Sequence, residues 1–239
     1  MAGLEAVLFD WGGTLSVFVP VELADMWRLA AHHLDPAREE EIAAQLFAVE
    51  NEFWADVARS QRSTDLAAIV AAASAALGLD VGEALLEEAA VCHLDAWTPH
   101  IAHDPDAAAV LAALRARGLR TAMLSNTHWP PAFHERFLER DGLAELLDAR
   151  VYSSALEYTK PHRSAFEATL RAVGVDDPAS AVFVGDRPYD DVYGAQQAGM
   201  RGVLKRHHCP IPDYEVEPDA TIDTLPELLA YVDGLGAGA

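Results

Sequence analysis

The stretch AVLFDWGGT, residues 6–14, joins four consecutive apolar residues to an aspartate, a tryptophan, two glycines and a threonine. The apolar run is typical of a buried strand, and the glycines after it let the chain turn sharply. An aspartate that follows such a strand stands at the C-terminal edge of a sheet, where open α/β folds bind their ligands. We therefore expect Asp10 to be a functional side chain at a sheet edge.

Short apolar or β-branched runs recur along the chain and end near Gly, Asp, Ser or Asn, which is typical of buried parallel strands. Between them, apolar residues recur at helical spacing and lead through Gly118 and Gly174 toward the next run. The expected strands are residues 4–9, 119–125, 150–153, 181–185 and 201–205. This alternation predicts an α/β fold built on a doubly wound, Rossmann-like parallel sheet.

Residues 17–100 interrupt this alternation, because their apolar positions recur only at helical intervals and indicate about four helices. Pro99 and Pro105 bracket the segment that returns the chain to the sheet, where a hinge would be natural. We expect an α/β core domain made of residues 1–16 and 101–239, and an α-helical cap domain of residues 17–100. Residues 234–239 are expected to fray.

Composition limits the classes of partner. The 239 residues are 51% hydrophobic and carry a formal net charge of −21, which opposes binding to nucleic acid or an anionic membrane surface. No apolar run approaches the roughly 18 residues of a membrane span, and the N-terminus does not resemble a signal peptide. The sequence thus predicts a cytoplasmic protein. Cys92 and Cys209 have no metal-binding spacing, so we expect reduced thiols.

Further polar groups stand where later strands end. Because the carboxyl ends of parallel strands share one edge of a sheet, these groups can converge on Asp10. One of them is among only two lysines in the chain, Lys160 and Lys205. The groups are Ser125 with Asn126, then Lys160, then Asp186 with Asp190 and Asp191.

This ordered set resembles the haloacid dehalogenase superfamily, whose phosphatases read DxDGT, then a strand ending in Ser or Thr, then Lys, then GDxxxD or GDxxxxD. The matching stretches are FDWGGTL (9–15), LSN (124–126), YTKP (158–161) and VGDRPYDDVYGA (184–195). The resemblance covers about 150 residues of the expected core. A helical insert directly after the first motif is also where many members carry their cap.

The resemblance implies a Mg²⁺-dependent phosphohydrolase that acts on a small phosphorylated metabolite through an aspartyl-phosphate at Asp10. Catalytic roles would fall to Asp10, Ser125 and Lys160, and phosphate binding to Gly13, Thr14, Ser125, Asn126 and Lys160. The metal would be held by Asp10, the main-chain carbonyl of Gly12, Asp186 and Asp191, with Asp190 left open as the alternative to Asp191.

Gly12 departs from the pattern. In the resembling phosphatases this position is a second aspartate that protonates the leaving group, and such help is worth about 10²–10⁴-fold in rate. Glycine cannot supply it. The help would be unnecessary for a substrate with a good leaving group, such as an acyl phosphate, or would come from the substrate's own groups. A histidine is the third option: His128 by position, with His100 and His103 behind it.

Three other functions are alternatives, and the sequence disfavours the first two. Dehalogenases of the superfamily resemble DxYGT and lack the metal-binding aspartates, which this chain keeps. Phosphonatases resemble DWAGT but use a cap lysine, and no lysine lies within residues 1–159. A protein that has lost turnover and serves as a binding or regulatory domain is the third.

The expected cap would close over the sheet edge, exclude water and contact the non-reacting end of the substrate. Tryptophan stacks on rings and arginine grips a second anion, so both types suit such a surface. The candidates are Trp27, Arg28, Trp54 and Arg62, of which helical periodicity favours a core position for Trp27.

Overall fold

The computed structural model describes residues 3–207 and 214–236. Six strands of this part form one parallel sheet in the order β3-β2-β1-β4-β5-β6. They are β1 (Ala6–Phe9), β2 (Arg120–Ser125), β3 (Ala149–Tyr152), β4 (Ala181–Gly185), β5 (Arg201–Lys205) and β6 (Ala220–Ile222). The predicted doubly wound α/β core is confirmed. The sequence patterns did not predict β6, because three residues at a sheet edge are too short for a periodic signal.

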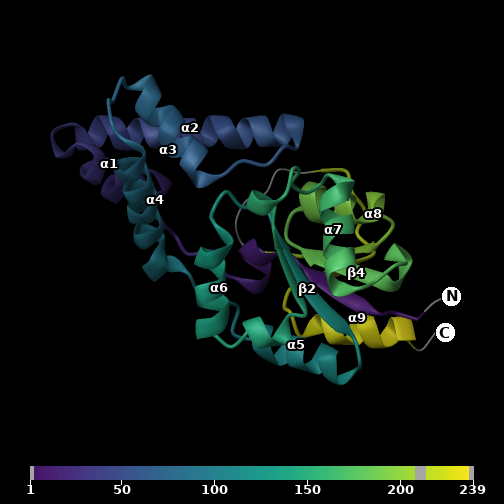
Figure 1. Cartoon of the computed structure of the whole chain (residues 1–239). Coiled ribbons are helices and arrows are strands. Elements are labelled where there is room, and N and C mark those ends of the chain that lie inside the picture. Colours follow the sequence, from purple (N-terminus) through teal and green to yellow (C-terminus); the bar gives the residue numbers. More distant parts are fainter. Residues whose placement is uncertain (1–2, 208–213, 237–239) are drawn as a thin grey trace.

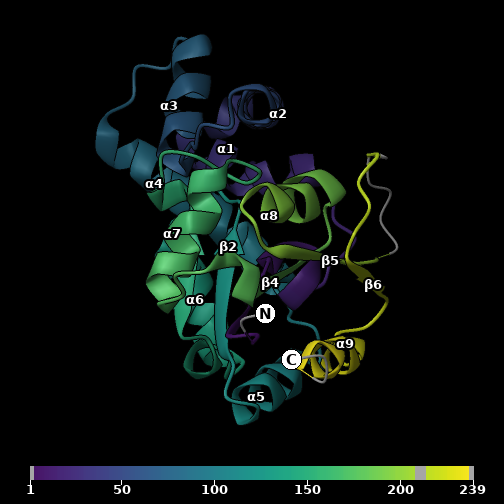
Figure 2. The ribbon, with the colours of Figure 1, turned by 90° about the vertical axis from the view of Figure 1, so that its right-hand side faces the viewer.

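Helices cover both faces of the sheet (Figure 2). Alternate strand residues point to opposite faces, so Val7 and Phe9 pack in one buried cluster while Ala6 and Leu8 pack in the other. The first cluster includes α5 (Ala107–Ala116), α6 (Pro131–Arg140) and α9 (Glu227–Gly236), and the second includes α7 (Arg163–Val173) and α8 (Gly194–Gln197). Gly118 and Gly174 follow α5 and α7 with positive φ, as the pattern of helix ends predicts.

Four α-helices lie between β1 and α5 and stand together beyond one end of the sheet (Figure 1). They are α1 (Arg28–Leu34), α2 (Glu39–Ser60), α3 (Leu66–Ala76) and α4 (Glu83–Trp97). We call this group the cap. It has a hydrophobic cluster of its own, in which Trp27, Leu46 and Ile69 are fully buried. The helical insert therefore folds around its own core.

The two chain segments that join the cap to the sheet run side by side. Val17 N donates to the carbonyl of Ala102 at 3.0 Å, and Ser16 pairs with His103 in an isolated antiparallel bridge. These contacts place the expected domain boundaries, after residues 16 and 100, next to one another. Asp104 N also donates to the carbonyl of Leu15 at 2.9 Å, so the segment expected to hold a hinge runs beside the end of the turn that follows Asp10.

The remaining expectations concern the termini and the thiols. Residues 234–236 lie in α9 and are helical, so the expectation that they fray is wrong, whereas residues 237–239 lie outside the described part. Cys92 is a partly buried free thiol, and Cys209 lies outside the described residues. Among the described helices, none has the length and apolar character needed to cross a lipid bilayer.

Candidate active site

Asp10 directly follows β1, which lies between β2 and β4 near the middle of the sheet. The chain then turns over Trp11–Leu15, and Gly13 has a φ of 75°. A Cβ on Gly13 would lie 2.8 Å from a carboxylate oxygen of Asp186, so this glycine is required for the close approach. Gly12 has an ordinary φ of −71°, and a Cβ there would meet nothing within 4 Å. The backbone therefore has room for a side chain at position 12.

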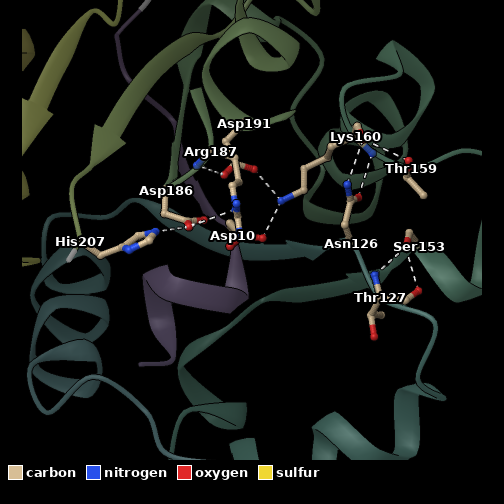
Figure 3. Close-up of polar contacts among 10 residues, drawn as sticks. All are labelled: Asp10, Asn126, Thr127, Ser153, Thr159, Lys160, Asp186, Arg187, Asp191 and His207. Atoms are coloured by element: carbon tan, nitrogen blue, oxygen red, sulfur yellow. Dashed lines mark hydrogen bonds and ion pairs between the residues drawn. The ribbon is translucent and has the colours of Figure 1, made fainter. Parts of the chain in front are cut away.

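Lys160 lies between two of the aspartates (Figure 3). Its Nζ is 2.6 Å from Oδ1 of Asp10 and 2.7 Å from Oδ1 of Asp191, and all three side chains are buried. The second oxygen of Asp191 accepts a hydrogen bond from the main-chain N–H of Arg187 at 2.9 Å. Asp190 lies on the wall of the cavity next to this group. The structure thus brings Asp191, and not Asp190, into direct contact with the lysine.

The predicted phosphate-binding residues lie around this lysine. Asn126 accepts from the N–H of Lys160 at 2.8 Å and donates to its carbonyl at 2.9 Å, so its side chain holds the lysine backbone in place (Figure 3). Ser125 ends β2 and faces the cavity. The hydroxyl of Thr14 is buried and has no hydrogen-bond partner within the described residues. The phosphate contacts of Ser125, Asn126 and Thr14 stay predictions.

Asp186 follows β4 and has a partner that the sequence motifs did not reveal. Its Oδ2 shares a hydrogen bond of 2.7 Å with Nε2 of His207, and its Oδ1 is buried without a partner in the part of the chain described (Figure 3). His207 stands two residues beyond β5, so the rule of polar residues at strand ends could have found it. From the end of β5, Lys205 donates to the carbonyl of Gly13 at 3.2 Å and braces the turn after Asp10.

Burial dominates the electrostatics of this group. It raises the pKa of Asp10 to about 6, against the opposing effect of Lys160. Burial, together with the charges of Asp10 and Asp191, raises the pKa of Asp186 to about 8. Burial alone would lower the pKa of Lys160, but the two carboxylates that it contacts outweigh burial and raise it. Lys160 and the partly exposed Arg187, whose Nε lies 3.4 Å from Asp186 Oδ2, therefore neutralise the three buried carboxyl groups only in part.

The donor set fits a hard divalent cation. Asp10, Asp186 and Asp191 each offer a carboxylate oxygen, and these oxygens lie within 4.8 Å of one another. Mg²⁺ prefers a few oxygen ligands of this kind together with water and substrate phosphate. Such an ion would give Asp186 Oδ1, which is buried without a partner among the described residues, a partner, and it would offset the repulsion between the crowded carboxyl groups.

A cavity of about 460 Å³ lies over this group, between the sheet and the cap. Its floor includes Asp10, Gly12 and Ser125, whereas Glu50 and Trp54 of α2 and Trp97 of α4 line it from the cap. Aromatic rings therefore surround much of the space above the carboxylates.

Of the four cap residues that we expected to contact a substrate, Trp54 lines the cavity. Trp27 is fully buried in the cap and donates its indole N–H to Glu50, in agreement with its helical periodicity. Arg28 pairs with Asp25 on the surface, and Arg62 pairs with Glu157. Neither arginine lines the cavity.

The candidate histidines differ in position. His128 lines the cavity, where burial lowers its pKa to about 3 and keeps its ring neutral. His103 accepts a hydrogen bond from the indole of Trp11 at 3.1 Å, so its other nitrogen donates to Asp141, at 2.7 Å. His100 is not among the cavity-lining residues, whereas His134 of α6, which the sequence did not single out, is one of them.

Known proteins resemble this chain in sequence. The family profile described as haloacid dehalogenase-like hydrolase matches residues 4–199. Phosphoserine phosphatase of Thermus thermophilus is 36% identical over 124 residues, which span 52% of this chain and 49% of the relative. Phosphoglycolate phosphatase of Rhodospirillum rubrum is 30% identical over 229 residues, 92% of this chain and 85% of the relative. For the first of these relatives, the match therefore spans only about half of its length.

Solved structures resemble the chain in fold. A 2-haloacid dehalogenase from Pseudomonas syringae superimposes with a TM-score of 0.69 at 24% identity, over 95% of this chain and 99% of its own. A phosphatase from Thermococcus onnurineus gives a TM-score of 0.64 at 23% identity, over 97% and 99%. At this identity the likeness establishes the shared fold, including the helical insert, and it does not choose between the two chemistries.

Proposed function

The chain belongs to the haloacid dehalogenase-like hydrolases, and from that premise we propose that it is a Mg²⁺-dependent phosphohydrolase of a small phosphorylated metabolite. One observation carries the proposal: Asp10, Lys160, Asp191 and Asp186 converge, buried, at the floor of one cavity. The relatives named as phosphatases support the same reaction class. The retained carboxylate cluster favours phosphoryl transfer over carbon–halogen cleavage.

In the proposed reaction a carboxylate oxygen of Asp10 attacks phosphorus, and the bond from phosphorus to the leaving oxygen breaks. Water then attacks the phosphorus of the aspartyl-phosphate, which releases phosphate and restores Asp10. Lys160 orients the attacking carboxylate and offers positive charge to the phosphoryl oxygens. Mg²⁺, held by Asp10, the Gly12 carbonyl, Asp186 and Asp191, would supply charge neutralisation when bound.

We infer that the preferred substrate has a good leaving group. Gly12 offers no proton, and the neutral ring of His128 has none to donate from an imidazolium at pH 7. An acyl phosphate leaves as a carboxylate and needs no protonation. The proposed substrate class therefore rests on the glycine at position 12.

The direct test is phosphate release from an acyl phosphate and from an aryl phosphate, with Mg²⁺ or with EDTA. We expect release from both with Mg²⁺, faster release from the acyl phosphate, and none with EDTA, because the three carboxyl groups repel a phosphate dianion without the ion. A folded protein that binds Mg²⁺ yet releases nothing from either compound would contradict the proposal and support a binding or regulatory role.

Replacing Gly12 with Asp should raise hydrolysis of an alkyl phosphate, a poor leaving group, by about 10²-fold. The new side chain has open space and an allowed backbone conformation, so the variant should fold. The rate on the acyl phosphate should change little, because that leaving group needs no proton. The measurement is kcat/KM for both substrates.

Gly12→Asn is the matched control for this variant, since it has nearly the same size and cannot act as a carboxylic acid. Equal rates for Gly12→Asp and Gly12→Asn would mean that the missing acid does not limit the reaction. In that case another group would already transfer the proton.

A further inference from the structure

A second cluster of metal-ligating side chains lies on the cap side of the cavity. Glu50 comes from α2, His93 from α4, and His128 from the loop that follows β2. Each offers one donor atom, and the three atoms lie within 4.8 Å of one another. Two ligands therefore belong to the cap and one to the sheet domain.

The tautomer of His93 leaves one nitrogen available. Its Nδ1 lies 3.2 Å from the main-chain carbonyl of Met26, and this contact requires the proton on Nδ1. Its Nε2 then carries a lone pair, which is buried without a partner in residues 3–207 and 214–236. A carbonyl that accepts from the far nitrogen is the usual way in which proteins orient a metal-binding histidine.

His128 also offers a ring nitrogen to a metal ion. Its side chain is 5% exposed, and neither ring nitrogen has a hydrogen-bond partner among the described residues. Its Nε2 lies 3.4 Å from Oε1 of Glu50, which equals the spacing of about 3.4 Å between two ligands around tetrahedral zinc. Burial keeps the ring neutral, so it does not form a conventional ion pair with Glu50.

The remaining surroundings hold these side chains in place. The ring of His93 stacks on Trp27 with centroids 3.6 Å apart, and the Trp27 indole donates to the second oxygen of Glu50 at 2.7 Å. One oxygen of Glu50 and one nitrogen of each imidazole thus lie within 4.8 Å of one another, while the outer atoms of Glu50 and His93 have hydrogen-bond partners. Two unpartnered buried imidazoles would otherwise cost free energy.

We propose that Glu50, His93 and His128 form a binding site for a transition-metal ion of the Zn²⁺ type that ties the cap to the sheet domain. Two imidazoles and one carboxylate match the ligands of Zn²⁺, whereas Mg²⁺ prefers oxygen alone. Three protein ligands leave a fourth coordination position for water or for an oxygen of a bound molecule. The site is separate from the carboxylate cluster and does not depend on the proposed phosphohydrolase activity.

The test uses the whole 239-residue chain without a histidine tag, stripped of metal and kept in millimolar Mg²⁺ so that the carboxylate cluster is occupied. We expect one equivalent of Zn²⁺ to survive dialysis and to raise the melting temperature. Co²⁺ in place of Zn²⁺ should give the intense visible absorption of a four- or five-coordinate site with nitrogen ligands. These wild-type measurements decide the proposal even if a variant fails to fold.

The variants His93→Gln and Glu50→Gln should each weaken Zn²⁺ binding by at least about 10-fold. His32→Gln is the matched control, because His32 pairs with Glu39 on the exposed surface of the cap and should leave Zn²⁺ binding unchanged. Wild-type protein that retains no Zn²⁺, that binds it no more tightly than His93→Gln, or that gives only the weak spectrum of octahedral Co²⁺ would overturn the proposal.

Discussion

Replacing Asp10 with Asn is expected to lower phosphate release by about 10⁴-fold or more, because an amide cannot form the covalent phosphoenzyme. The substitution keeps the shape of the side chain and removes one of three crowded carboxyl groups, so the variant should fold. The measurement is single-turnover and steady-state release from an acyl phosphate in Mg²⁺. Acid-quenched wild-type protein should carry label from a ³²P-labelled substrate, and the variant should carry none.

Asp190→Asn is the matched control, since it makes the same chemical change next to the cluster. Asp190 lines the cavity but does not contact Lys160, so its replacement should cost much less activity than that of Asp10. Retained turnover and labelling in Asp10→Asn would reject Asp10 as the nucleophile. If Asp190→Asn loses as much activity as Asp10→Asn, Asp190 would have a role in the reaction that its position next to the cluster does not suggest.

Replacing Lys160 with Met should lower the free energy of unfolding by about 3–5 kcal/mol at about pH 8 in the absence of a divalent ion. The lysine side chain is 2% exposed and neutralises both Asp10 and Asp191, so its loss leaves buried carboxylates without a cation. Mg²⁺ should restore part of the stability, because it supplies charge to the same oxygens. Urea unfolding with Mg²⁺ and with EDTA measures both effects.

The destabilisation by Lys160→Met should shrink as the pH falls toward about 5. The folded-state pKa of Asp186 is raised from 3.8 to about 8 and that of Asp10 to about 6, so the folded protein binds protons more tightly than the unfolded chain between these values. The stability contributed by these protons is present at low pH and is lost as the pH rises through the folded-state pKa. Without the lysine the pKa values of Asp186 and Asp10 rise further. The difference in the free energy of unfolding between Lys160→Met and the wild type is therefore largest at high pH.

Lys205→Met is the control for the loss of a buried lysine. Lys205 contacts the Gly13 carbonyl and lies 3.5 Å from Asp104, outside the carboxylate cluster. Its replacement should show a weaker pH dependence and no recovery with Mg²⁺. If Lys160→Met and Lys205→Met respond alike to pH and to Mg²⁺, the charge balance assigned to Lys160 is wrong.

The sequence alone determined the sheet and the approximate place of its site. Apolar runs and helical periodicity are local properties, so they revealed five of the six strands and the helical insert. The candidate site followed from one physical rule: parallel strands end on the same edge, where residues 10, 186 and 191 meet Lys160 from the loop region after β3. The proposal that Gly12 replaces an acid also comes from the motif in the sequence.

Only the tertiary structure decided which neighbouring side chains face the site. Asp190 and Asp191 are adjacent in sequence, and the turn after β4 directs Asp191 alone onto Lys160. The tertiary structure also determines the partners of the histidines. Both ring nitrogens of His103 form hydrogen bonds, with Trp11 and Asp141, whereas the ring nitrogens of His128 have no hydrogen-bond partner within the described chain.

The Glu50, His93 and His128 cluster had no sequence signal, because its members lie on two cap helices and one core loop with no metal-binding spacing. The direction of a side chain depends on helix packing and on how the cap meets the sheet. Those contacts join residues far apart in the chain. Local sequence patterns therefore determined the helices, the strands and the places where strands end, whereas packing determined which side chains contact one another.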